Sequence, residues 1–78
     1  MEREEKVKLV QNSTTSPEVL ESLSKDSDYW IRLNVAWNPN TSQEVLTKLV
    51  NDRNEEVSEM AKEKLLEREE NSFEFNDF

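Results

Sequence analysis

One block of this sequence is written twice, and the repetition limits the possible folds more than any other feature. Residues 12–26 align with residues 38–52 without a gap, and the identical pairs are Asn12/Asn38, Thr15/Thr41, Ser16/Ser42, Glu18/Glu44, Val19/Val45, Leu20/Leu46, Leu23/Leu49 and Asp26/Asp52. The offset from Asn12 to Asn38, called the repeat spacing below, is the same for every pair. A fixed spacing of this length is typical of stacked repeats, in which each unit buries its apolar face against its neighbours. The chain is therefore expected to form a repeat stack, a class of fold that is compatible with many functions.

Composition indicates that the repeated units are helical. The chain has no Gly and only two Pro among its 78 residues, which disfavours β-hairpins and tight strand turns. A chain of this length forms one small domain, and with 33% apolar residues its core must be thin. We expect an all-α domain with one continuous core. The expected core residues are Val19, Leu20, Leu23, Ile31, Val35, Val45, Leu46, Leu49, Val57, Ala61 and Leu65.

The pattern of apolar residues and capping residues predicts five helices. They are expected over about residues 2–11, from a Ser16 cap to about Lys25, over about residues 28–37, from a Ser42 cap, and from about Asp52 to about Glu70. Ser16 and Ser42 are good N-cap residues. Asp52, followed three residues later by Glu55, resembles a capping box for the last helix.

The expected helix ends define the domain organisation. Asn38 is expected to close the third helix in the left-handed conformation, and Pro39 prevents that helix from continuing. The sequence divides into a helical repeat domain at residues 1–70 and an acidic, Phe-containing C-terminal tail at residues 71–78.

The repeated block resembles a known family. Residues 38–52 read Asn-Pro-Asn-Thr-Ser-x-Glu-Val-Leu-x-x-Leu-x-x-Asp, and residues 31–39 read Ile-Arg-x-x-Val-Ala-x-Asn-Pro. Over about Leu9 to Lys62, these motifs resemble the leucine-rich repeat variant family, a relative of HEAT-like helical repeats. The resemblance implies a short right-handed α-solenoid of about five helices, with two 26-residue repeats plus flanking helices, used mainly for binding.

The resemblance also has limits that can be read from single residues. Some family members carry an iron–sulfur cluster on cysteines outside the repeats, but this chain has no cysteine, so no cofactor is carried over. Ser13 stands where the turn would have Pro, and Ser58 stands where the other repeat has Arg32, which indicates terminal, capping repeats. Arg32 with Asp26 or Asp52 resembles the ladder that ties neighbouring repeats together and is expected to be structural.

Missing residue types disfavour catalysis. The absence of Cys and His excludes disulfides and thiolate metal sites, and it removes the usual catalytic base and the usual nitrogen ligand. The sequence also lacks a Gly-rich phosphate loop and any evident nucleophile–base pair. We therefore expect a protein that is not an enzyme and that uses no metal or cofactor.

Charge and hydropathy limit the partners. A net charge of −8 is opposite in sign to what phosphate contacts need, so direct nucleic-acid binding is not expected. Residues 1–6 are mostly charged and carry no apolar run, and no segment approaches membrane-spanning length. We expect a cytoplasmic protein that does not bind membranes.

Two Trp residues are candidate protein-binding residues. Trp30, Asn34 and Trp37 recur at i, i+4 and i+7, on a different face of the third helix from Ile31 and Val35. If the aliphatic pair faces the core, the stripe lies at the surface, where Trp residues make good interface anchors. The alternative is that one or both Trp residues widen a thin core.

The last helix carries a line of carboxylates. Glu55, Glu59, Glu63 and Glu67 recur every four residues, which places like charges roughly 6 Å apart. Residues 55–78 hold nine acidic and three basic residues, a net charge of −6. One interpretation is a binding face for a basic, nucleic-acid-handling protein whose phosphate track the stripe imitates. The other is a solvated helix face.

The C-terminal tail has three interpretations. Its end at Phe78 resembles the acidic docking peptide of bacterial single-stranded-DNA-binding proteins. Alternatively, Phe73 and Phe75 fold back over the last helix pair as a lid, or the tail is disordered. The lid is favoured over the docking peptide, because a stack of two full repeats leaves two apolar ends that need covering.

These observations lead to two functional expectations. The first is a non-catalytic adaptor, a small helical-repeat module that binds a protein through the face near Trp30, Asn34 and Trp37. The alternative is a small acidic inhibitor or nucleic-acid mimic that blocks a basic nucleic-acid-binding protein through the carboxylate line. Two repeats are fewer than the three normally needed to bury such a core. Either the tail therefore caps the stack, or copies pair end to end as a homodimer.

Overall fold

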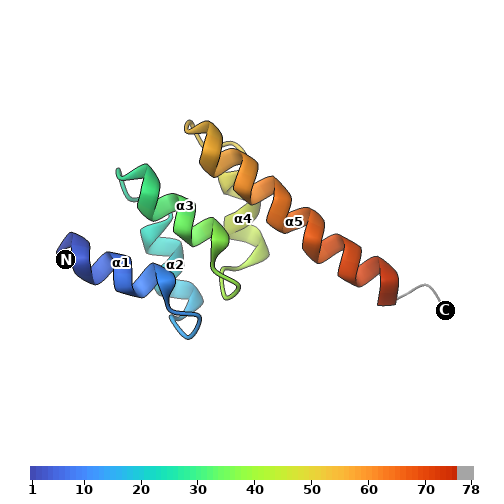
Figure 1. Ribbon diagram of the computed structural model, residues 1–78, viewed down its shortest axis with the longest axis horizontal. Helices are drawn as coiled ribbons and strands as arrows, with labels where there is room; N and C mark the ends of the chain where they lie inside the picture. Colours follow the sequence, from blue (N-terminus) through green and yellow to red (C-terminus); the bar gives the residue numbers. More distant parts are fainter. Residues whose placement is uncertain (76–78) are drawn as a thin grey trace.

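Five α-helices account for the regular structure in the computed structural model, which describes the backbone of residues 1–75 and the side chains of residues 1–69 (Figure 1). They are α1 (Arg3–Gln11), α2 (Pro17–Leu23), α3 (Tyr29–Trp37), α4 (Gln43–Leu49) and α5 (Glu55–Phe75). The part of the chain that the structure describes contains no β-strand. The expectation of an all-α fold with five helices is therefore confirmed.

The helices form two layers. Figure 1 shows α1, α3 and α5 following one another across the molecule, with α2 and α4 behind them. α3 packs against both α1 and α2, and α5 packs against both α3 and α4. The molecule is elongated, with extents of 48 × 26 × 15 Å. Each later helix of the front layer thus lies on the helix pair that precedes it.

The turns after α1 and α3 are each closed by a hydrogen bond of the same kind, from a Thr hydroxyl to a helix carbonyl. Thr15 Oγ1 donates to the carbonyl oxygen of Leu9 at 2.6 Å, and Thr41 Oγ1 donates to that of Val35 at 2.6 Å. Both Thr residues are buried, and each hydroxyl binds a carbonyl in the last turn of a helix, where intrahelical partners run out. Residues at equivalent positions of the repeated block therefore make the same contact.

The N-caps of α2 and α4 are also equivalent. Ser16 Oγ accepts the Val19 N–H at 3.3 Å, and Ser42 Oγ accepts the Val45 N–H at 3.1 Å. Both Ser residues precede the first helical residue and have extended backbone angles, as N-cap residues do. The two predicted Ser caps are confirmed.

The predicted capping box for the last helix is wrong. Asn54 precedes α5, and its Oδ1 accepts the N–H groups of Glu56 at 2.9 Å and Val57 at 3.2 Å. The Asp52 carboxylate instead accepts the Asn54 N–H at 2.8 Å. This contact bends the chain into an Asx-type turn ahead of the helix. The helix therefore begins at Glu55, later than the Asp52 start expected from the sequence.

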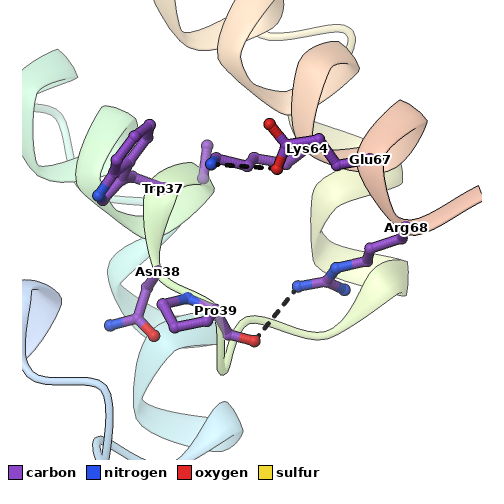
Figure 2. A pocket seen from close by; sticks show the side chains of 7 residues that line it. Trp37, Asn38, Pro39, Lys64, Glu67 and Arg68 are labelled. Carbon is purple, nitrogen blue, oxygen red and sulfur yellow. Dashed lines mark hydrogen bonds and ion pairs between the residues drawn. The ribbon is translucent and has the colours of Figure 1, made fainter. Parts of the chain in front are cut away.

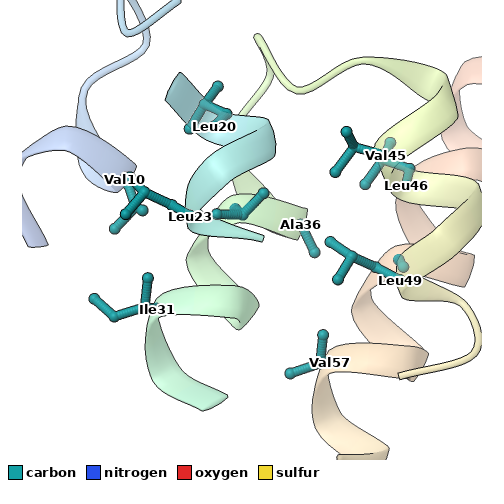
Figure 3. Close-up of a cluster of buried hydrophobic side chains, with 11 residues drawn as sticks. Val10, Leu20, Leu23, Ile31, Ala36, Val45, Leu46, Leu49 and Val57 are labelled. Carbon is teal, nitrogen blue, oxygen red and sulfur yellow. The ribbon is translucent and has the colours of Figure 1, made fainter. Parts of the chain in front are cut away.

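The core is one continuous cluster through all five helices (Figure 3). Its buried members are Val10, Leu20, Leu23, Ile31, Val35, Ala36, Val45, Leu46, Leu49, Val57 and Ala61. Nine of these were predicted, whereas Val10 and Ala36 were missed and the predicted Val19 and Leu65 are only partly buried. Ala36 is buried because α3 is covered on more than one side, so its buried face is wider than a single apolar stripe.

Asn38 ends α3 in a different way from that predicted. Its φ of −69° and ψ of 125° are extended, not left-handed. Its side chain is buried, and Nδ2 donates to the carbonyl oxygens of Val10 at 2.8 Å and Asn12 at 3.0 Å. Its Oδ1 accepts the Asn40 N–H at 2.8 Å. Asn38 therefore shapes its own turn and also joins that turn to the end of α1.

α5 is much longer than the other helices because no turn signal interrupts it. Lys64 and Leu65 stand one repeat spacing after Asn38 and Pro39, the residues that end α3. Neither Lys nor Leu stops a helix, so α5 extends over 21 residues. No helix in the described part of the chain combines the length and the apolar character needed to cross a membrane.

The last helix continues into the segment that was predicted to be the C-terminal tail. Residues 71–75 continue α5, beyond the expected end of the helical domain at residues 1–70. The backbone of this segment runs on past α4 and does not turn back over the last helix pair (Figure 1). Residues 71–75 therefore do not form the predicted lid. Phe78, the predicted docking end of the tail at residues 71–78, lies outside the described residues.

Candidate interaction surface

The predicted Trp–Asn–Trp stripe lines a groove between α3 and α5. Trp30, Leu33, Asn34 and Trp37 of α3 face Met60 of α5 across an open depression of about 250 Å³. The three predicted residues lie together because one face of α3 is left over after Ile31, Val35 and Ala36 enter the core. The groove is formed where α5 packs against α3.

The two Trp residues differ in exposure. Trp30 is partly buried against the core cluster, with the guanidinium carbon of Arg3 5.4 Å from the centre of its ring. Trp37 is 56% exposed, although it belongs to a chain with few apolar residues to spare. The interpretation of a Trp that widens the core therefore fits Trp30 in part and does not fit Trp37.

Asn34 presents an acceptor at the groove. Its Nδ2 donates to the Trp30 carbonyl oxygen at 2.9 Å within the helix, which orients the amide. Among the hydrogen bonds of the described residues, the Asn34 Oδ1 accepts none. Because Asn34 is only partly buried, this oxygen can accept a donor from a bound partner.

Trp37 also borders a second, smaller hollow of about 160 Å³ (Figure 2). The Lys64 ammonium lies 3.7 Å from the centre of the Trp37 ring, within the range of a cation–π contact. The same ammonium donates to Glu67 Oε1 at 3.3 Å. One face of the exposed ring is therefore occupied by a cation from α5.

Arg68 closes the far side of this hollow. Its Nη2 donates to the carbonyl oxygen of Thr41 at 2.7 Å and approaches that of Pro39 at 3.4 Å (Figure 2). The turn after α1 receives a similar donor, because Asn40 Nδ2 donates to the Thr15 carbonyl oxygen at 2.6 Å. Arg68 thus gives the turn after α3 a donor equivalent to the one that Asn40 gives the turn after α1.

The predicted carboxylate line divides between two parts of the α5 surface. Glu55, Glu59, Glu63 and Glu67 are all exposed. Glu63 and Glu67 follow Met60 at i+3 and i+7, on the side of α5 that borders the groove. Glu67 also lines the hollow beside Trp37. Four residues of a helix turn through about 40° more than a full circle, so a line of residues at this spacing winds slowly around the helix. Glu55 and Glu59 therefore lie further from the groove side of α5 than Glu63 and Glu67 do.

The sequence alone did not assign Leu33, Met60, Lys64 or Arg68 to this surface. Leu33 falls between the Trp residues on the same face of α3, so its spacing could have revealed it. Met60 and Lys64 carry no such signal, because their part in the surface depends on how α5 packs against α3. The acidic and aromatic candidates were predicted as separate sites, whereas the structure places Glu67 and Trp37 around one hollow.

Two ion pairs at equivalent positions of the repeat join helices to the turns that follow. The Arg32 guanidinium donates to both Asp52 carboxylate oxygens, at 2.8 and 3.1 Å, and its Nη1 donates to the Asp26 carbonyl oxygen at 2.7 Å. Lys6 donates to Asp26 Oδ2 at 2.6 Å, the equivalent contact one repeat spacing earlier. Of the two partners expected for Arg32, Asp52 supplies the carboxylate and Asp26 supplies a backbone carbonyl.

These contacts change the acidity of the turn carboxylates. Burial raises the pKa of Asp52, but hydrogen bonds from Arg32 and from the Asn54 N–H outweigh it and hold that pKa below its usual value. The Lys6 hydrogen bond, with that of a backbone N–H, likewise lowers the pKa of Asp26. The three turn residues Asp26, Asp28 and Asp52 are therefore stabilised as carboxylates.

Neither chemistry nor similarity assigns a reaction to this surface. Within the described residues, no group of three or more acidic side chains is placed to hold a metal ion. Comparisons with protein-family models, with curated proteins and with solved structures gave no match. The class that the structure itself defines is an all-α protein with a grooved, partly aromatic face.

Proposed function

We propose that this chain is a non-catalytic protein-interaction module whose groove between α3 and α5 holds a segment of a partner protein. The observation that carries the proposal is Trp37, which is 56% exposed at the edge of a groove lined by other apolar side chains. Trp is enriched among the residues that dominate binding energy at interfaces. Its large apolar area is of little use to folding when it faces water.

The proposed architecture is a short right-handed α-solenoid similar to the leucine-rich repeat variant family. Its support is the recurrence of turn, cap and ion-pair contacts at the repeat spacing. In this architecture α5 takes the position of a third repeat's first helix, with Val57 where α3 has Ile31. α1 has the exposed Glu5 at that position, so the N-terminal end of the array carries a charged residue where α3 has a buried apolar one. A polar end suits a terminal repeat and opposes end-to-end pairing.

The proposed function is tested by partner capture with matched variants. Immobilised chain is exposed to extract of the source cell, and bound proteins are compared for the natural sequence, Trp37→Ala and Leu66→Ala. Leu66 is the control, because it is an α5 residue that is 57% exposed and does not line the groove. A specific partner should be lost with Trp37→Ala and kept with Leu66→Ala. Equal capture by all three chains would refute the groove as the binding site.

The exposed acidic face of α5 supports a second candidate, a small acidic inhibitor or nucleic-acid mimic. Within the described residues, Glu67 is the member of the line that forms an ion pair, leaving Glu55, Glu59 and Glu63 facing water. An inhibitor held by these carboxylates should bind more weakly as salt is added, and Glu55→Lys/Glu59→Lys should weaken it further. A partner that is still bound by the Glu55→Lys/Glu59→Lys variant but is lost with Trp37→Ala supports the interaction module.

A further inference from the structure

We infer that the partner segment is a basic, amphipathic peptide. One apolar side chain of this peptide fills the groove between Trp30 and Met60, and a Lys or Arg beside it pairs with Glu63 and Glu67. This inference rests on the proposed function of the groove and adds the chemistry of its occupant.

The surface of α5 beside the groove is acidic. Glu56, Met60, Glu63 and Glu67 follow one another at i, i+4, i+7 and i+11, so they form one stripe along the helix. Met60 lines the groove, and the three Glu residues of the stripe are exposed. An apolar anchor that contacts Met60 therefore has carboxylates within reach on the same wall.

The α3 wall carries no charge of its own. Trp30, Leu33, Asn34 and Trp37 supply aromatic, aliphatic and amide surface. The nearest cation at this end is Arg3, which is paired with Asp28 at 2.8 Å as well as lying near the Trp30 ring. The charge that a partner meets in the groove is therefore set by α5, through the Glu residues of the stripe and through Lys64 beside the Trp37 ring.

Trp37 shows that this surface accepts a cation. The Lys64 ammonium already lies 3.7 Å from the ring centre, between the ring and Glu67. In this ion pair the Glu67 side chain is 54% exposed, whereas the Lys64 side chain is 21% exposed. The Glu67 carboxylate can therefore accept a second cation from the partner while Lys64 stays at the ring.

Charge also disfavours a second copy of this chain as the occupant. The chain carries a net charge of −8, and its C-terminal part, residues 55–78, holds nine acidic against three basic residues, a net charge of −6. An acidic segment docked along the Glu stripe would bring like charges together, which is unfavourable at an interface. A basic segment has the opposite sign and gains from the same field.

The inference is tested with three fluorescent peptides of about 14 residues, roughly four helical turns each. The first has a Leu stripe with Lys on its flanks, the second replaces every Lys with Glu, and the third replaces every Leu with Ser. Binding is followed by fluorescence anisotropy. The Leu/Lys peptide should bind at least about tenfold more tightly than either of the others. Only this peptide has both apolar side chains for the groove and cations for the Glu stripe of α5.

Matched variants of the chain locate the charge contact. Glu63→Gln/Glu67→Gln should weaken the Leu/Lys peptide about tenfold, whereas Glu59→Gln/Glu69→Gln, which removes the same charge from the rest of α5, should weaken it less than about twofold. Adding Trp37→Ala to either Gln double variant should weaken binding of the Leu/Lys peptide further. Equal losses for the two Gln pairs would indicate attraction by overall charge and would overturn the inference.

The remaining outcomes separate this inference from the proposed function. If the Leu/Glu peptide binds as well as the Leu/Lys peptide and both depend on Trp37, the groove is a binding site but the inferred partner chemistry is wrong. If no peptide binds, the inference is overturned, and partner capture with Trp37→Ala decides the function independently. A dimer in light scattering that Trp37→Ala dissociates would identify a second copy as the occupant and would also overturn it.

Discussion

The Arg32 guanidinium and the Asp52 carboxylate form a two-point contact, with Nε 2.8 Å from Oδ2 and Nη2 3.1 Å from Oδ1. The side chains are only 4% and 7% exposed. One repeat spacing earlier, Lys6 makes a single contact with Asp26 in a more exposed setting. The Arg pair therefore lies where α3 and the turn before α5 are joined, and the Lys pair lies nearer the end of the molecule.

Asp52→Asn should destabilise the fold by about 3 kcal/mol, because it leaves the charge of Arg32 buried without its partner. The free energy of unfolding from urea denaturation measures the effect. Asp28→Asn is the control, since it faces the well-exposed Arg3 and Asn keeps the N-cap of α3. A similar loss for both variants would contradict the special role of the buried pair.

Stability should fall in acid because three carboxylates have lowered pKa values. In the folded chain the pKa is below the usual value of 3.8 for each of Asp26, Asp28 and Asp52. Their contribution is complete above the unfolded pKa, so it should be present at neutral pH and lost as the pH falls below about 4 toward the folded values. Urea denaturation between neutral pH and pH about 2.5 measures this loss. In Asp52→Asn the decline should be shallower, and an unchanged decline would show that Asp52 does not contribute.

Asn38→Ala should cost roughly 2–4 kcal/mol, because the Val10 carbonyl and the Asn40 N–H lose their partner. The Asn12 carbonyl loses one of its two donors and keeps the Thr15 N–H. The thermal midpoint and the urea midpoint should both fall. Asn12 is the matched control, since it is exposed and its Oδ1 serves only Thr14. If Asn12→Ala is as harmful as Asn38→Ala, the bridge from Asn38 to the end of α1 is not what stabilises the turn.

Arg68→Ala should destabilise the fold by about 1–2 kcal/mol, because the Thr41 carbonyl loses a charged donor. Lys62→Ala changes another long cation on α5, but one that is exposed, and should have little effect. Comparison of the two urea midpoints measures the difference. Equal midpoints would indicate that α5 beyond the core does not support the turn after α3.

Sequence reasoning succeeded where a signal is local. Ser16 and Ser42 were predicted as N-caps, because a hydroxyl next to a helix start meets N–H groups three residues away whatever the rest of the chain does. The core was largely predicted for a similar reason, since helical spacing alone puts Leu20 and Leu23, or Leu46 and Leu49, on one face.

It failed where two signals of the same kind competed or where the partner lies far along the chain. Both Asp52 and Asn54 are good capping residues, and local propensity does not decide which of them begins the helix. Asn38 was assigned a backbone conformation common for Asn at helix ends, but its amide reaches Val10 and Asn12 at the end of a different helix. Such contacts exist only after the helices have packed.

Part of the candidate surface could likewise be predicted from the sequence, and part depends on the packing of the helices. Helical periodicity orders side chains on a single element, so the sequence was enough to predict the helices, the face of α3 that carries Trp30, Asn34 and Trp37, and the line of carboxylates on α5. That Met60 lies opposite the Trp residues, and that Lys64 and Glu67 lie beside Trp37, follows only from the folded chain. The position of α5 against α3 depends on side-chain packing between residues far apart in the chain, and a local pattern carries no information about it.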